Sequence, residues 1–263
     1  MERHPVAAGT FYYANPDVLR KSVSELFTGA EKGSCVGVVS PHAGYVYSGR
    51  CAAQAISALK KAETFVLLGP NHTLMGPEFS VMGRGAWETP LGRVEIDEEM
   101  ARRLKRNRVL EEDTFAHEHE HSIEVQLPLM QHTLGSFRIV PISIANTSYS
   151  GAFLERCVSL GKALAAEGVP IVASSDFSHY MPAEKAKKQD MEAIEAILRL
   201  DVGGFFDILR KNDASVCGFG PIAVLMSAMK ESERKGKLIA YTSSGEATGD
   251  FKSVVAYAAI GFG

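Results

Sequence analysis

Short apolar runs alternate along the whole chain with longer segments of helical periodicity. The runs are rich in Val and Ile and bounded by Gly, Pro and Ser, which is typical of strands buried on both faces. They cover residues 35–40, 64–69, 137–144, 169–175, 237–244 and 253–261. Apolar residues recur at helical spacing in the segments between them, at about 49–61, 97–106, 122–134, 149–167, 182–199, 202–212 and 219–234. This alternation predicts an α/β fold, with a central, mostly parallel or mixed β-sheet flanked by helices on both faces.

Length and composition favour one globular domain that handles a small molecule. A chain of 263 residues without an internal repeat or linker suits a single α/β domain, so we expect one domain over residues 1–263. Its net charge of −3 offers no basic surface for nucleic acid or for an anionic membrane. We therefore expect a small-molecule substrate, with a protein as the other candidate partner.

The cysteines and the N-terminus indicate where the protein resides. Cys35, Cys51, Cys157 and Cys217 are widely separated and form no CxxC pair, which disfavours a disulfide framework or a zinc ribbon. The N-terminus has no apolar signal region, and no segment approaches the roughly 18 apolar residues of a membrane span. We expect a cytoplasmic protein.

Histidines follow three of the predicted strands. His42 comes after the first apolar run, His72 after the second, and Asp176 with His179 after the fourth. Loops at the carboxyl ends of strands converge on one crevice in open α/β sheets, so these side chains are candidates for one site. A single histidine after a strand is more often a loop residue bonded to backbone, but its repetition at three strand ends favours a shared function.

Cys217 stands before the predicted helix at 219–234, in the sequence "VCGFGPI". Its position places the thiol near a helix N-terminus, where the helix dipole favours a thiolate. The alternative is a small buried hydrophobic residue, the commoner fate of a free cysteine. We accept that alternative for the other three cysteines.

The stretch "HEHEH" matches the H-E-x-x-H pattern of zinc peptidases, with His117 and His121 at its ends. That pattern binds zinc only when both histidines lie one turn apart on a helix. The stretch has no apolar helical stripe, and the helical signal begins after it, with Pro128 in an early position. We interpret the match as a coincidence and expect His117 and His119 at the surface. His121, followed by Glu124, is the best of the three for an inward role.

Five separated motifs resemble those of the Memo family, which is itself similar in fold to the class III extradiol ring-cleavage dioxygenases. They lie in order between residue 41 and about residue 222, and they read "PHAGYVYSG", "GPNH", "EHSIEVQLP", "SSDFSHY" and "VCGFGPI". The resemblance implies a sheet-centred α/β fold and a metal site formed by His42, His72 and Cys217. It also implies that His121, Asp176 and His179 form a polar shell around the metal.

The function implied is that of a non-haem Fe(II)-dependent dioxygenase, or a related oxidoreductase, which acts on a small oxidisable substrate. A three-residue ligand set leaves positions open for substrate and O₂. Because thiolate is a softer ligand than carboxylate, Cu or Zn are alternative metals. We expect His179, oriented by Asp176, to be the general acid/base, and His121 to hold substrate or oxygen.

Two other hypotheses remain open at this stage. In the first, the chain is a non-catalytic metal-binding or adaptor protein that kept the dioxygenase fold. In the second, it is a thiol hydrolase that uses Cys217, His179 and Asp176. The chain also lacks two histidines that animal members carry beside "AAGTFY" and after the cysteine, so their phosphopeptide binding is not carried over.

Overall fold

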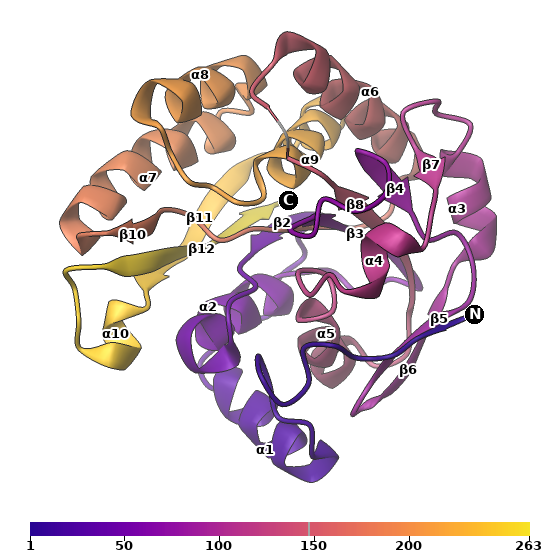
Figure 1. Ribbon diagram of the computed structural model, residues 1–263, viewed down its shortest axis with the longest axis horizontal. Coiled ribbons are helices and arrows are strands. Elements are labelled where there is room, and N and C mark those ends of the chain that lie inside the picture. Colours follow the sequence, from indigo (N-terminus) through magenta and orange to yellow (C-terminus); the bar gives the residue numbers. More distant parts are fainter. Residues whose placement is uncertain (147) are drawn as a thin grey trace.

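Four parallel strands form the middle of the sheet in the computed structural model, which describes residues 1–146 and 148–263 (Figure 1). In spatial order they are β8 (Arg138–Ile144), β3 (Thr64–Pro70), β9 (Ile171–Ser174) and β2 (Gly37–Ser40). Nearly all their residues are buried, which is why their sequences are continuous apolar runs rather than alternating ones.

Antiparallel and shorter strands extend the sheet on both sides. Beyond β2 lies β12 (Val254–Phe262), which pairs antiparallel with β2. It also pairs antiparallel with β11 (Gly236–Ser243) and with β10 (His179–Met181). On the other side lie β6 (Gly92–Ile96), β5 (Ala86–Thr89) and β1 (Glu2–Arg3), and β8 also pairs with β4 (Phe79–Val81), which pairs with β7 (Glu111–Glu112). The mixed sheet confirms the predicted fold class.

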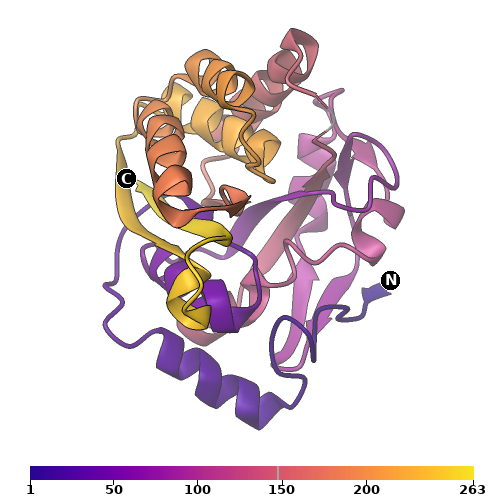
Figure 2. The same ribbon diagram turned by 60° about the vertical axis from the view of Figure 1, so that its left-hand side comes forward.

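Two helical layers cover the two faces of the sheet (Figures 1 and 2). The layer on one face contains α3 (Glu98–Leu104), α6 (Gly151–Glu167), α7 (Ala183–Leu198), α8 (Val202–Asn212) and α9 (Phe219–Glu231). The layer on the other face contains α1 (Pro16–Leu26), α2 (Tyr45–Ser57) and α5 (Gln126–Leu134).

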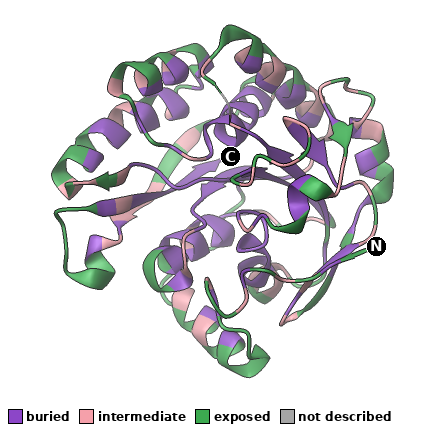
Figure 3. Cartoon of the chain, in the orientation of Figure 1, coloured by how far each residue is buried: buried purple, intermediate pink, exposed green. Residues whose placement is uncertain are grey.

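Successive strand residues enter opposite hydrophobic cores because side chains alternate across a strand. In β3, Val66 and Leu68 pack under α9, whereas Phe65 and Leu67 join the core beneath α2 and α5. The sheet is accordingly buried throughout its centre, and the outer faces of the helices are exposed (Figure 3). Over residues 1–146 and 148–263, no helix is long and apolar enough to cross a membrane.

The predicted elements correspond to observed ones. The six predicted strands are β2, β3, β8, β9, β11 and β12, and the seven predicted helices are α2, α3, α5, α6, α7, α8 and α9. Within α5 the helix begins at Gln126 rather than at 122, because residues 122–125 form a separate turn, and Pro128 lies in the first turn as expected. The prediction missed α1, whose buried residues are Leu19 and Val23, and the short strands between residues 79 and 112.

Candidate metal centre

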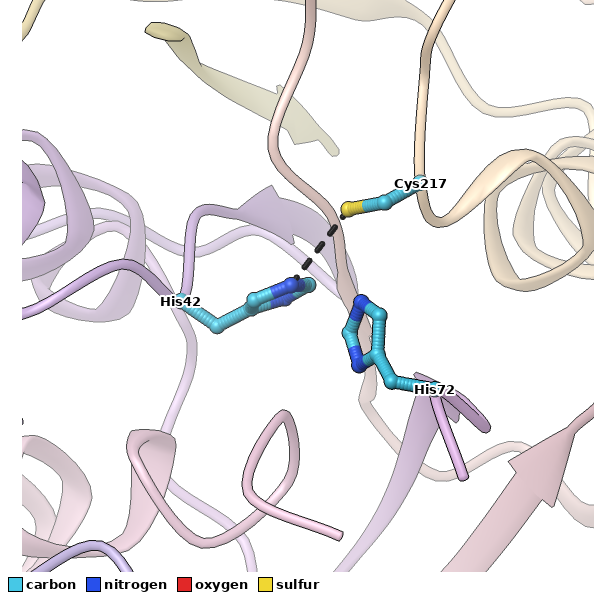
Figure 4. Close-up of side chains that lie close together, drawn as sticks. All are labelled: His42, His72 and Cys217. Atoms are coloured by element: carbon cyan, nitrogen blue, oxygen red, sulfur yellow. Dashed lines mark hydrogen bonds between the residues drawn. The ribbon is translucent and has the colours of Figure 1, made fainter. Parts of the chain in front are cut away.

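Three segments that are distant in sequence bring His42, His72 and Cys217 together at the carboxyl edge of the sheet (Figure 4). His42 follows β2, His72 follows β3, and Cys217 precedes α9. One ligand atom from each lies within 4.8 Å of the other two. The parallel strands β3, β9 and β2 are neighbours, so the loops that leave them meet at this edge.

The spacing of these atoms fits a shared metal ion. Cys217 Sγ lies 3.3 Å from His42 Nε2, and the rings of His42 and His72 are 5.2 Å apart. At usual zinc–sulfur and zinc–nitrogen bond lengths, two ligands of one tetrahedral ion lie about 3.5 Å apart. The group therefore has both the donor types and the spacing of a metal site.

Glu120 holds His72 in place. The backbone N–H of His72 donates to Glu120 Oε2 at 2.5 Å, and His72 Nδ1 lies 3.0 Å from Oε1, which also accepts from the Ser122 N–H at 2.8 Å. Burial raises the pKa of Glu120, but the hydrogen bond and charge of His72 outweigh it and lower that pKa to about 2. Because an ionised carboxylate only accepts, His72 Nδ1 carries a hydrogen, and in the neutral ring the lone pair is on Nε2. Burial lowers the pKa of His72, but the hydrogen bond and charge of Glu120 outweigh it and raise that pKa, so a metal competes with a proton for Nε2.

Glu120 is not among the site residues predicted from the sequence, because its stretch has no apolar helical stripe and was expected to lie at the surface. It is 1% exposed. The available signal was its place directly before His121, at the start of "EHSIEVQLP".

Cys217 is fixed by hydrogen bonds to the segments that follow β9 and β8. The Asp176 N–H lies 3.2 Å from Cys217 Sγ, and Asn146 Nδ2 donates to the Cys217 carbonyl at 2.5 Å while its Oδ1 accepts from the Gly220 N–H at 2.9 Å. The next residue must be glycine, because a Cβ at Gly218 would lie 2.4 Å from the Ser174 carbonyl oxygen.

The thiol lies at the N-terminus of α9, as predicted. Burial, with the nearby Asp176 carboxylate, raises the pKa of Cys217 in the metal-free protein. A thiolate at this position would need a cation beside it, and a metal ion held with His42 and His72 would supply one.

Asp176 and His179 line the same cavity and interact through their charges, but the hydrogen bonds that hold each side chain go to other residues. Asp176 Oδ1 accepts from the His42 N–H at 2.8 Å, and burial raises the pKa of this carboxyl. His179 is oriented instead by Ser215, whose Oγ accepts from the His179 N–H and whose carbonyl lies 2.8 Å from His179 Nδ1. Since a carbonyl only accepts, Nδ1 carries a hydrogen, and in the neutral ring Nε2 carries none.

His121 lies beside the proposed ligands. Its ring stacks on that of His72 at 4.9 Å and contacts Phe11 at 4.4 Å, and burial lowers its pKa. Glu124 does not support His121 as the sequence suggested. Its carboxylate instead accepts from Arg3 at 2.7 Å and from the Tyr12 hydroxyl at 2.6 Å.

The H-E-x-x-H match is a coincidence, but one surface prediction within it is wrong. The helix α4 (Phe115–Glu118) ends before His121, so the two terminal histidines do not share a helix. His119 is exposed as expected, whereas His117 is buried, and burial lowers its pKa to about 3. Arg3 covers this segment and donates to the His117 carbonyl at 2.6 Å, a contact that no local pattern reveals.

A cavity of about 520 Å³ is lined by two of the three proposed ligands, His42 and His72. Its lining combines titratable groups with aromatic rings and includes His42, His72, His121, Asp176, His179, Tyr47, Tyr180 and Tyr257. Tyr180 is the extra residue of a β-bulge between β10 and β12 and has a left-handed φ of 57°. The metal candidate and the acid/base candidates therefore share one cavity large enough for a small molecule.

The fold and this site define an α/β protein with a histidine–cysteine group at the carboxyl edge of its sheet. A family model described as "Memo-like protein" matches residues 3–261. A MEMO1 family protein from Methanosarcina barkeri is 44% identical over 98% of both chains, and one from Methanopyrus kandleri is 43% identical over 100% of this chain and 99% of the other. The chain therefore belongs to the Memo family, which confirms the resemblance.

The fold is also found in a solved structure of low sequence similarity. The crystal structure of an uncharacterized protein from Escherichia coli K12 has a TM-score of 0.60 and 14% identity, and the match covers 85% of this chain and 98% of that one. At this identity the likeness concerns the fold alone.

Proposed function

We propose that this protein binds one metal ion through His42, His72 and Cys217 and uses it to oxidise a small substrate with dioxygen. Fe(II) is the first choice of metal, with Cu and Zn as the alternatives that a thiolate ligand admits. The observation that carries the proposal is the convergence of the three ligand atoms within 4.8 Å, two of them on histidines that line the cavity.

The histidines are prepared for metal binding by their own hydrogen bonds. His72 directs its Nδ1 hydrogen to Glu120, which leaves Nε2 as the nitrogen that can bind a metal. Burial lowers the pKa of His42 well below its ordinary value, so its ring is neutral near pH 7, as a metal ligand must be. A bound Fe(II) ion supplies coordination positions at which substrate and dioxygen meet.

The remaining polar side chains handle protons and orient the substrate. His179 holds its hydrogen at Nδ1 against the Ser215 carbonyl, so Nε2 accepts a proton from a substrate hydroxyl and later returns it. His121, stacked on His72, forms the substrate-side wall of the cavity. Asp176 anchors the backbone of His42 and keeps that ligand at the strand end.

The thiol hydrolase hypothesis is less well supported. It requires Cys217, His179 and Asp176 to act in sequence, but Asp176 Oδ1 accepts from the His42 N–H and His179 Nδ1 faces Ser215. The imidazole nitrogen beside the sulfur is His42 Nε2. In a metal site, His42 Nε2 and Cys217 Sγ would be two ligands of one ion, which explains why they lie side by side.

The proposal is tested by anaerobic purification, reconstitution with Fe(II), and elemental analysis of the wild type and of His42→Ala and Cys217→Ala. We expect about one equivalent of iron in the wild type and a loss of binding in both variants. His119→Ala is the matched control, because His119 is exposed and lies outside the site. Unchanged iron content in the two ligand variants would show that the site is wrong.

Oxygen uptake with a panel of catechols then separates catalysis from metal binding alone. His179→Ala should bind iron normally and lose about 10²- to 10⁴-fold in turnover, the usual contribution of an acid/base group. Normal iron binding without oxygen uptake on any substrate would favour the non-catalytic metal-binding or adaptor alternative.

A further inference from the structure

A buried chain of polar side chains lies behind His42, on the side away from the cavity. It contains Ser40 at the end of β2, Ser174 at the end of β9 and Gln126 at the start of α5. Ser40 and Ser174 are paired neighbours in the parallel ladder. All three residues are at most 1% exposed, so their hydrogen bonds must be made within the protein.

The surrounding acceptors determine how Gln126 is oriented. Its amide nitrogen lies 2.9 Å from the Pro41 carbonyl, which can only accept, and 3.0 Å from Ser174 Oγ. Its amide oxygen accepts from the Ser40 hydroxyl at 2.7 Å. Gln126 therefore uses both amide hydrogens as donors, one of them to Ser174.

The hydrogen-bond partners of Ser174 likewise determine which ring nitrogen of His42 carries the hydrogen. The hydroxyl of Ser174 has one hydrogen, and it donates this to the Ser122 carbonyl at 2.7 Å. Toward its other neighbours Ser174 Oγ can only accept, from Gln126 and from His42 Nδ1 at 2.8 Å. The hydrogen of neutral His42 thus resides on Nδ1, and the lone pair on Nε2 faces Cys217 Sγ at 3.3 Å.

We propose that Ser174 and Gln126 are positioning residues, which select the tautomer of His42 that presents Nε2 to the metal. Ser174 acts directly, and Gln126 acts through it by keeping the serine oxygen an acceptor. The proposed benefit to metal affinity rests on the metal-binding function proposed above, whereas the tautomer itself is a property of the metal-free protein.

The tautomer is measured by nitrogen NMR of the metal-free wild type with ¹⁵N-labelled histidine, at a pH above the ordinary histidine pKa of about 6.5. The His42 signals are assigned by their absence in His42→Gln. We expect Nδ1 to carry the hydrogen and Nε2 to be bare. A hydrogen found on Nε2 would overturn the inference, and the tautomer itself is read from the wild type, with the variant used only to assign the signals.

The effect on binding is measured by anaerobic titration with Co²⁺, whose thiolate absorption band reports ligation by Cys217. Ser174→Ala should weaken Co²⁺ binding by about 10- to 100-fold, the usual cost of losing a group that orients a metal ligand. Gln126→Met should weaken it less, because Ser174 can still accept from His42. Ser227→Ala is the matched control, since this buried serine donates to the Ala223 carbonyl of its own helix and should leave affinity unchanged.

The possible results are distinguishable. A folded Ser174→Ala protein that binds Co²⁺ within twofold of the wild type would overturn the positioning role. A loss of equal size in Ser227→Ala would also overturn it, because the effect would then be general destabilisation. If the wild type binds no Co²⁺ at all, the proposed function fails, and the tautomer measurement still decides whether this hydrogen-bond chain sets His42.

Discussion

Replacing Arg3 by Met should destabilise the metal-free protein by about 3–5 kcal/mol, the usual cost of breaking a buried ion pair by removing one partner. The side chains of Arg3 and Glu124 are 4% and 0% exposed and lie 2.7 Å apart. Arg3 also donates to the carbonyls of His117 and Glu120, both at 2.6 Å. The substitution would leave the Glu124 carboxylate buried without a cation.

The size of this effect follows from the environment rather than from the number of hydrogen bonds. Glu124 keeps the Tyr12 hydroxyl and the N–H groups of Val6 and Ala7 as donors, but none of these is charged. A loss of about 3–5 kcal/mol is a large part of the 5–15 kcal/mol that stabilises a typical domain. Because Arg3 also binds the Glu120 carbonyl, the loop that supports His72 should loosen and Co²⁺ affinity should fall.

The assay is urea unfolding of the wild type, Arg3→Met, Glu124→Gln and the double variant. The double variant should lose less than the sum of the two single losses, because it contains no unpaired buried charge. Arg93→Met is the matched control: Arg93 pairs with Glu2 and Glu95 but is 50% exposed, so its loss should cost less than about 1 kcal/mol. Equal losses in the two arginine variants, or simple additivity in the double variant, would refute the reasoning.

Three further predictions concern single positions. Glu120→Gln should weaken Co²⁺ binding about 10- to 100-fold in the same titration, and an unchanged affinity would contradict the role assigned to Glu120. Tyr180→Gly should be more stable than Tyr180→Ala by about 1 kcal/mol in thermal unfolding, because residue 180 has a left-handed φ of 57°, which glycine adopts without strain. A more stable alanine variant, the ordinary order, would contradict this prediction. Burial alone would raise the pKa of Asp97, but hydrogen bonds from the Met100 N–H and the Thr64 hydroxyl, together with nearby arginines, lower it. The ionised Asp97 carboxylate therefore stabilises the fold above the ordinary pKa of aspartate, and this contribution is lost as the pH falls below it. Wild type should therefore lose more stability than Asp97→Asn on acidification, and parallel pH curves would contradict this.

The central strands and the residues that follow them could be predicted because their signals are local. A parallel strand buried on both faces must be apolar throughout, and it must end where polar residues begin. His42 and His72 follow such ends, and neighbouring parallel strands deliver their loops to the same edge. The short outer strands between residues 79 and 112 have no comparable apolar run and were missed.

The supporting contacts of the site could not be predicted, since each depends on a residue far away in the chain. Ser215, rather than the nearby Asp176, orients His179. His117 is buried because Arg3, 114 positions away, covers its segment. Glu120 is buried next to the exposed His119, and the residue that its carboxylate supports, His72, lies 48 positions away.

The sequence by itself determined the α/β class, the order of the main elements and, through five separated motifs, the family and its candidate ligands. The tertiary structure decided which atoms of those ligands face one another and which carboxylate supports His72. The physical reason is the range of the interactions. Hydrophobic periodicity is a property of neighbouring residues, whereas the burial of a polar group and the identity of its hydrogen-bond partner are set only when distant segments pack together.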